Sequence, residues 1–477
     1  MNDIKALKAL KNKILSLAMQ GTLLKQNEND EPASVLLEKI RLEKETLLNQ
    51  GKLKKETPLP PINADEEPYE LPNSWQWVRL GEVFIIERGS SPRPISQYVT
   101  DDINGINWIK IGDAAKGSKY ITQTKEKITQ DGAAKSRFVE IGDLIFSNSM
   151  SYGRPYILKI NGCIHDGWNV LRPIYIKNNN TIISINQNFI YYAIASTLLQ
   201  NQIRFEANGG IVENIKSDNL KQVYFPLPPL VEQERIVVKI EEMFAIIDEI
   251  EKNIAENKKI SKILYNRLLS HAMQGKLIKQ NENDEPASVL LEKIRLEKEN
   301  LLKQGKLKKE KPLPPISAEE VPYKLPNSWQ WIRLGEVCEI IKREKSDNIN
   351  LPLMDVKYLR TKENPKIYNS GIIVYKNELI ILVDGENSGE VFTVFEQGIL
   401  GSTLNILDIS INVNTKYILF ILSYFKDTFR NSKKGAAIPH LDKNLFKNLP
   451  IPLPPLAEQE RIVAKIEEIK EIIDEIG

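Results

Sequence analysis

Apolar residues at helical spacing mark three segments of this chain. In the segment 231–275 they recur at steps of four and three: Ile236, Ile240, Met243, Ile247, Ile250 and Ile254. The same steps return near the C-terminus at Ile462, Ile466, Ile469, Ile473 and Ile476, and a shorter series near the N-terminus consists of Leu7, Leu10, Ile14 and Leu17. Such a seam lies along one helix face and requires a partner helix. We therefore predict paired helices within the chain, and the alternative is an ordinary coiled coil used for oligomerisation.

Prolines and acidic residues mark where two of these helices begin. The segments 226–229 and 452–455 are proline-rich, and each is followed by the tripeptide Glu-Gln-Glu. Proline stands before or at a helix start, and acidic side chains in the first turn suit the helix dipole. A further amphipathic helix is predicted over 32–49, followed by a basic and then proline-rich linker.

The chain contains long internal repeats in a circular order. Residues 19–83 return almost unchanged at 273–337, and residues 226–250 return at 452–476. The ends continue this pattern, because residues 1–21 align with 255–275 and residues 457–477 align with 231–251. The two terminal segments would together complete a second copy of the central helix. The repeats predict a pseudo-two-fold arrangement with two equivalent docking surfaces.

The repeats enclose two inserts that differ from each other, 87–225 and 341–451. Both inserts show short β-type runs separated by turn residues, then a helical stretch and a glycine turn. The expected strands lie in 105–114, 142–149, 163–176, 378–395 and 398–409, and the expected helical stretches are 186–207 and 414–432. The fold class is therefore α+β, with two β-rich domains of similar fold separated by an antiparallel pair of long helices, a coiled-coil spacer.

This organisation gives five expected segments. Two β-rich domains span 22–225 and 276–451, a central helix spans 226–275, and the segments 1–21 and 452–477 form the two halves of a composite helix beside it.

Composition narrows the class of protein only slightly. The chain has 65 Lys and Arg against 63 Asp and Glu and a net charge of +2, so any DNA-binding surface must come from local clustering. Cys163 and Cys338 stand far apart without a CxxC spacing, which favours a reducing compartment over a disulfide or zinc framework. The N-terminus is too charged for a signal peptide, and no apolar run approaches the ~20 residues of a membrane span. We expect a cytoplasmic location.

Motifs of catalysis are missing from the sequence. It has no phosphate-binding GxxxxGK[ST] loop, no GxGxxG after a strand, and no Asn/Asp-Pro-Pro-aromatic tetrapeptide. The three histidines, His165, His271 and His440, are far apart in sequence and form no metal-binding pattern. His165-Asp166 has the composition of a dyad, but no nucleophile accompanies it. We interpret the chain as a non-catalytic protein without a metal site.

Polar and basic loops of the inserts are the candidates for contact with DNA. Phosphate contacts position a protein on DNA, and Arg and Asn pair bidentately with guanine and adenine edges. In the first insert the candidates are Arg88, Ser90, Ser91, Arg93, Lys110, Lys116, Lys119, Ser147, Asn148, Ser149, Tyr152 and Arg154. In the second they are Lys342, Arg343, Lys345, Lys362, Asn387, Lys433 and Lys434. For each of them the alternative is a solvated surface loop.

Two tryptophan pairs, Trp75 with Trp77 and Trp329 with Trp331, lie in the repeated segments. They could stack on bases, but their period-two spacing at a strand start favours core packing.

The repeated motifs resemble the specificity (S) subunit of Type I restriction-modification enzymes. They are LPxxWxWxRLGE at 71–82 and 325–336, PLPPLxEQERIVxKIEE at 226–242 and 452–468, and GSSPRPISQY at 89–98. The resemblance covers nearly the whole chain. It implies that each insert is a target recognition domain for one half of a bipartite, asymmetric DNA site, with the helices setting the gap.

The resemblance also implies partners. Two modification subunits, which are adenine N6 methyltransferases carrying S-adenosylmethionine, would dock on the repeated segments, and restriction subunits using ATP and Mg²⁺ would join them. This chain would carry no cofactor. Two alternatives remain: a specificity chain for another methyltransferase or nuclease system, and a coiled-coil scaffold that binds no DNA.

Overall fold

The computed structural model describes residues 2–55, 57–63, 66–115, 117–148, 153–178, 181–207, 215–305, 312–432 and 440–476. The chain divides into two compact units, 1–252 and 253–477, here called the first and second unit. Helix α8 (Leu230–Met273) contributes to both. None of the helices in the described ranges combines the length and apolarity that a membrane crossing requires.

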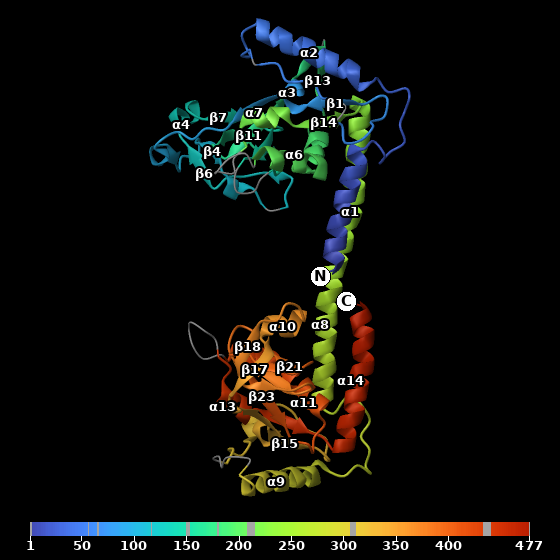
Figure 1. Cartoon of the computed structure of the whole chain (residues 1–477), viewed down its shortest axis with the longest axis vertical. Coiled ribbons are helices and arrows are strands. Elements are labelled where there is room, and N and C mark those ends of the chain that lie inside the picture. Colours follow the sequence, from blue (N-terminus) through green and yellow to red (C-terminus); the bar gives the residue numbers. More distant parts are fainter. Residues whose placement is uncertain are drawn as a thin grey trace. The chain divides into compact units, whose positions relative to one another are not determined.

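The helices of the first unit include one that lies antiparallel to α8. Its helices are α1 (Asn2–Met19), α2 (Ala33–Asn49), α3 (Leu80–Val83), α4 (Gln130–Ala134), α5 (Gln187–Ala195), α6 (Thr197–Ala207) and α7 (Ser217–Gln222). Lys11 of α1 forms an ion pair with Asp248, whereas Gln26, beyond the end of α1, donates to Glu232 near the start of α8. The first part of α8 therefore runs opposite to α1 (Figure 1).

Two five-stranded sheets form the β-rich part of the first unit, in the orders β2-β11-β8-β9-β5 and β3-β6-β4-β10-β7. The strands are β1 (Gln76–Arg79), β2 (Phe84–Arg88), β3 (Val99–Thr100), β4 (Ile106–Ile109), β5 (Tyr120–Ile121), β6 (Glu126–Ile128), β7 (Arg137–Val139), β8 (Leu144–Ser147), β9 (Pro155–Leu158), β10 (Gly162–Ile164), β11 (Trp168–Pro173), β12 (Ile176–Asn178), β13 (Thr181–Ile183) and β14 (Tyr224–Leu227).

Alternation along β8 explains how these layers stack. Leu144 and Phe146 belong to the same buried cluster as Phe189 of α5, whereas Ile145 belongs to a second cluster with Ile109 of β4. Successive strand residues point to opposite faces of a sheet. One face of the β2-β11-β8 sheet therefore packs on helices and the other on the second sheet.

The second unit repeats this arrangement with fewer strands, in the orders β16-β23-β20-β21 and β18-β17-β22-β19. Its strands are β15 (Gln330–Arg333), β16 (Cys338–Ile341), β17 (Ser346–Met354), β18 (Ile367–Gly371), β19 (Ile373–Val374), β20 (Leu379–Leu382), β21 (Val391–Thr393), β22 (Gly398–Leu400), β23 (Leu404–Ile409) and β24 (Pro450–Leu453). Its helices are α9 (Ala287–Lys303), α10 (Val356–Thr361), α11 (Thr415–Tyr424), α12 (Lys426–Asn431), α13 (Lys443–Asn448) and α14 (Leu456–Ile476). A parallel pair with equivalent position stands among antiparallel neighbours in both units, β4 with β10 and β17 with β22, and the first unit has a further parallel pair, β5 with β9.

Helix α14 lies antiparallel to the second part of α8 (Figure 1). Ser261 of α8 donates to the carbonyl oxygen of Ile473, near the end of α14, at 3.3 Å. At its other end, α14 faces the segment after α8, because Arg461 forms an ion pair with Asp284. The predicted pairing of the first and last helices with the middle one is thus confirmed within each unit.

The predicted apolar seams are only partly buried. In α8, Ile240 and Ile247 are buried, but Ile250 is exposed. In α1, Leu10 is exposed, while Leu15, which lies outside the predicted series, is buried. Helix α1 also packs against α5 and α6, so its buried face is wider than a two-helix seam.

Trp75 has the structural role predicted for it, since it is buried and its indole Nε1 donates to Glu232 at 2.9 Å. Trp329 repeats this bond with Glu458, also at 2.9 Å. Each bond ties a β-rich part to the first turn of a long helix, so both tryptophans serve the core.

Candidate nucleic-acid interface

A tight turn at residues 165–167 gathers several of the predicted DNA-contact residues of the first unit. It joins β10 to β11. The Nε of Arg88 donates to the carbonyl oxygen of Asp166 at 3.0 Å, and the hydroxyl of Ser91 donates to the Asp166 Oδ1 at 2.9 Å. The guanidinium of Arg93 donates to Oδ2 at 3.4 Å. Three residues of the Arg88–Arg93 segment thus converge on one side chain and its backbone.

Strand register brings this segment to the turn. Arg88 ends β2 opposite Asn169, the second residue of β11. The next residue, Gly89, donates its backbone N–H to Trp168 at 2.8 Å, and a Cβ at this position would lie 2.1 Å from the carbonyl oxygen of His165. Only glycine allows so close an approach of the two backbones. Ser90 lies one residue further on, with its hydroxyl donating to Lys135 at 3.2 Å.

Asn148, the residue after strand β8, supports the turn. Its side-chain amide donates to the Asp166 carbonyl oxygen at 3.1 Å, and its backbone N–H donates to Gly167 at 3.0 Å. The residue is 1 % exposed, so its amide is turned inward. Ser147 is buried too, and its hydroxyl accepts the backbone N–H of Arg154 at 3.3 Å. Among these residues, Arg154 is exposed.

The turn presents an ionised carboxylate beside two arginines. Partial burial opposes ionisation of Asp166, but the Ser91 hydrogen bond and the nearby positive charge outweigh it, so its pKa is lowered. Burial lowers the pKa of His165, whose Nδ1 accepts the Gly167 backbone N–H at 2.6 Å. The Arg93 side chain is 82 % exposed and Asp166 is 44 % exposed. This charged pair is therefore open to solvent.

The two described lysines predicted in the first unit have protein partners. Lys110 forms an ion pair with Glu126. Lys119 is 14 % exposed, and its Nζ lies 2.7 Å from Glu241 of α8 and 4.7 Å from the ring centre of Tyr192. The Lys119 charge thus fastens the β-rich part to α8. Three further candidates, Lys116, Ser149 and Tyr152, lie outside the described residues.

The counterpart of this turn in the second unit is residues 401–403, which join β22 to β23. Its first backbone N–H donates to the carbonyl end of β17 at 3.2 Å, just as the first N–H of the 165–167 turn donates to β4 at 3.3 Å. The last carbonyl of each turn accepts the N–H of the residue following β8 or β20. Ser402 therefore occupies the position of Asp166.

The basic candidates of the second unit lie at the end of β16. Lys342 follows this strand at the position of Arg88 in the repeat, and it is exposed, as is Lys345. Arg343 forms a bidentate pair with Glu378 at 2.9 and 2.6 Å and stacks over the ring of Tyr375. Lys342 and Lys345 are therefore the freely exposed charges of this group, while Arg343 stiffens the loop.

The remaining candidates of the second unit lie on other loops. Lys362 has a left-handed backbone with φ of 57° at the end of α10, and its ammonium lies over the ring of Phe395. Asn387 accepts a hydrogen bond from Arg430 through its Oδ1. Two further candidates, Lys433 and Lys434, lie outside the described residues.

Sequence reasoning missed the acidic members of these loops. The sequence marks Asp166 only as half of a His-Asp pair, because the residue types typical of DNA contact are basic or amide side chains. In the second unit the His440 Nδ1 lies 2.6 Å from Asp384, 56 positions earlier. The glycine after Asp166 and the strand before it are signals that predict a turn at this residue. No sequence pattern joins Asp384 to His440.

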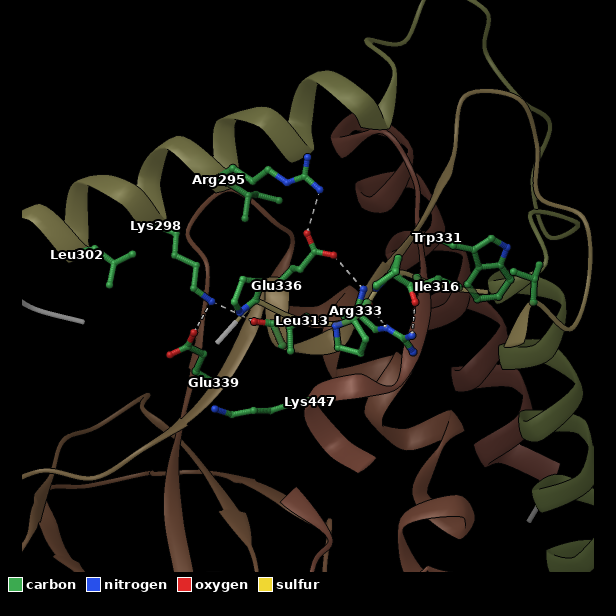
Figure 2. Close-up of a pocket in the computed structure, with 16 residues that line it drawn as sticks. Arg295, Lys298, Leu302, Leu313, Ile316, Trp331, Arg333, Glu336, Glu339 and Lys447 are labelled. Atoms are coloured by element: carbon green, nitrogen blue, oxygen red, sulfur yellow. Dashed lines mark hydrogen bonds and ion pairs between the residues drawn. The ribbon is translucent and has the colours of Figure 1, made fainter. Parts of the chain in front are cut away.

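Each unit contains ion pairs within its own copy of the repeated segment, and these pairs match between the units. In the second unit they surround a cavity of about 700 Å³ beside α9. Figure 2 shows Arg295 reaching Glu336 and Lys298 reaching Glu339 across this cavity, at 3.4 and 2.5 Å. The first unit repeats the Arg295–Glu336 pair as Arg41–Glu82, also at 3.4 Å. Within the described residues no cluster of His, Cys, Asp and Glu suits a metal ion.

Both units repeat the same ion pairs and the same turn but carry different loops. These features define the class of protein: a chain that presents two different recognition surfaces on equivalent scaffolds. The model of the Type I restriction modification DNA specificity domain matches residues 72–262 and 326–476, and the chain belongs to this family. The resemblance noted in the repeated motifs is thereby confirmed. A specificity chain selects DNA and is not the catalytic component, so we assign it no reaction and no cofactor.

Similar proteins extend over nearly the whole chain. The EcoAI and EcoEI specificity subunits of Type I restriction enzymes from Escherichia coli are each 28% identical to it. These alignments cover 98% and 99% of this chain and 89% and 91% of the relatives. A chain from a solved structure concerned with complex assembly and conformational transition of the type I R-M system is similar in fold, with a TM-score of 0.60 at 21% identity. That match covers 86% of this chain and 93% of the other.

Proposed function

We propose that this chain reads a bipartite, asymmetric DNA sequence, with one half-site contacted by each β-rich domain. The domains are residues 22–225 and 276–451, and the helical segments 1–21, 226–275 and 452–477 set the gap between the half-sites. The observation that carries the proposal is the pair of equivalent turns, 165–167 and 401–403, on which different side chains stand. A shared support with different side chains is what reading two unlike half-sites requires.

In the first domain, Arg88, Ser91 and Arg93 approach DNA together, because all three are held at one turn. Arg93, whose side chain is 82 % exposed, takes a phosphate or a guanine edge, and Ser90 and Arg154 add polar contacts. Lys342 and Lys345 serve the second half-site from the corresponding strand end. Lys110 and Lys119 contribute positive charge but are occupied by carboxylates, so we rank them below the arginines.

The partners in this proposal are two modification subunits and the restriction subunits of a Type I complex. The duplicated contacts favour two copies of one partner, because a repeated surface offers the same docking site twice. The partly exposed ion pairs Arg41–Glu82 and Arg295–Glu336 are one such duplicate. S-adenosylmethionine, ATP and Mg²⁺ belong to those partners, and the complex works in the cytoplasm.

A salt titration of DNA binding tests the proposal. The chain is purified with its modification subunits, and affinity for cognate duplex is measured from low to physiological salt. The logarithm of the affinity should fall with the logarithm of salt by about 0.9 for each phosphate neutralised. Arg93→Ala should lower this slope by about one. Affinity that is absent, or indifferent to salt, would instead support a scaffold, and co-purification of an unrelated nuclease would support another restriction system.

A further inference from the structure

Asp166 is an acidic side chain at the centre of a surface proposed to bind a polyanion. Both of its carboxylate oxygens are engaged, Oδ1 by Ser91 and Oδ2 by Arg93. Its carbonyl oxygen separately accepts from Arg88 and Asn148. The backbone of Asp166 therefore organises the turn, whereas the carboxylate acts on Ser91 and Arg93.

We propose that the Asp166 carboxylate determines the specificity of the first half-site, by holding Arg93 in the DNA-free protein and repelling phosphates that are not in register. This inference rests on the proposed DNA-reading function and deepens it. Asp166 is a positioning and discriminating residue in this account, and Arg93 is the group that it restrains.

The strength of the restraint suits an exchange with DNA. The Arg93–Asp166 pair is 3.4 Å long and open to water, and exposed ion pairs of this kind contribute little. A correctly placed phosphate or guanine edge can therefore take Arg93 from the carboxylate. The carboxylate that is released can accept a hydrogen bond from the N4 amino group of cytosine. At a wrong sequence the same charge stays unpaired near phosphates, which penalises binding.

The second unit provides an internal comparison. Ser402 stands where Asp166 stands in the first unit, and a hydroxyl neither restrains arginine by charge nor repels phosphate. At this turn the restraint is therefore confined to the first unit, whereas Arg343 of the second unit is held by Glu378, the residue before β20. Replacing the Asp166 carboxylate should leave reading of the other half-site unchanged.

The test is Asp166→Asn in the full chain with its modification subunits. The amide keeps the size of the side chain and still accepts from Ser91, and the bonds from Arg88 and Asn148 go to the unaltered backbone, so the turn should persist. Affinity is measured for cognate duplex and for a duplex of unrelated sequence, and methylated adenines are mapped in cells. Asp101→Asn, an exposed acidic residue on the loop after β3, removes the same charge elsewhere in the domain.

We expect Asp166→Asn to bind unrelated DNA about five-fold more tightly, the effect of one unit charge at ~4 Å in water. Methylation should spread to sites altered in the first half, while the second half stays fixed and Asp101→Asn behaves as the natural chain. Asp166→Glu should keep weak binding to unrelated DNA, since the charge is retained. Equal loss of both affinities, or no change in either, would overturn the inference while leaving the DNA-reading function intact. A natural chain that binds no DNA would overturn both.

Discussion

Arg79→Met is the substitution whose cost the structure defines most closely. Arg79 is 5 % exposed. Its Nε donates to Pro60 at 2.8 Å, and its terminal nitrogens donate to Gln222 at 2.7 Å, Pro61 at 3.3 Å and Glu66 at 3.0 Å. One side chain thus ties the proline-rich segment to the end of α7. Methionine retains much of the apolar stem and removes every one of these bonds.

The two short carbonyl bonds from the charged guanidinium contribute about 1.5 kcal/mol each. The Glu66 pair is partly exposed and adds about 1 kcal/mol. The expected cost is therefore about 4 kcal/mol, most of it from the two carbonyl bonds. Because the weaker Pro61 bond is omitted, this figure is on the low side.

Hydrogen exchange read by mass spectrometry measures the free energy of opening in each unit separately. Arg79→Met should lower it in the first unit and leave the second unchanged. The matched control is Arg333→Met, whose guanidinium has the equivalent partners, including Glu320, in the second unit. Its effect should be confined to that unit. A loss below about 1 kcal/mol for Arg79→Met would refute the reasoning, because bonds of this kind would then be energetically neutral.

Three further predictions concern α8 and its contacts. Lys119→Met should weaken attachment of the first β-rich part to α8 and so destabilise the first unit. The dependence of DNA affinity on salt should not change. A smaller salt dependence would show that Lys119 contacts a phosphate instead. Burial raises the pKa of Glu232, so the folded state holds the proton more tightly and stability falls as pH rises from the ordinary value of 4.5 to the raised one. Glu232→Gln should make the free energy of unfolding depend less on pH over that window. An unchanged pH dependence would contradict the raised pKa of Glu232. Inserting four residues in α8 adds ~6 Å to a helix and should widen the gap in the methylated sequence while both half-sites persist, and an unaltered gap would exclude the spacer role.

Periodicity and repeats were sufficient to predict the long helices, because part of each apolar series is buried against a neighbouring element. The helix over 32–49 and the strands within 105–114, 142–149, 163–176, 378–395 and 398–409 follow from that pattern, whereas strands such as β9 and β17 were not predicted. Burial in α1 escaped prediction, since it depends on α5 and α6, which approach from far along the chain.

The candidate site was predictable in residue type but less so in role. Arg88 and Arg93 stand where glycine, serine and proline suggested a loop, and both reach the same turn. Asn148 has the right chemistry for adenine but points inward, and Lys119 is paired with a residue 122 positions away. The sequence does not show that Ser402 is the counterpart of Asp166, because the two inserts differ in length. Only the strand register and backbone hydrogen bonds align the two residues.

Exchange of the first insert tests the modular account most directly. Residues 87–225 are replaced by the corresponding insert of another specificity chain, and methylated adenines are mapped across the genome of cells that express the hybrid with its modification subunits. The account predicts that one half of the methylated sequence changes and that the other half stays as it was. A hybrid that alters both halves, or neither, would contradict the assignment of one half-site to each domain.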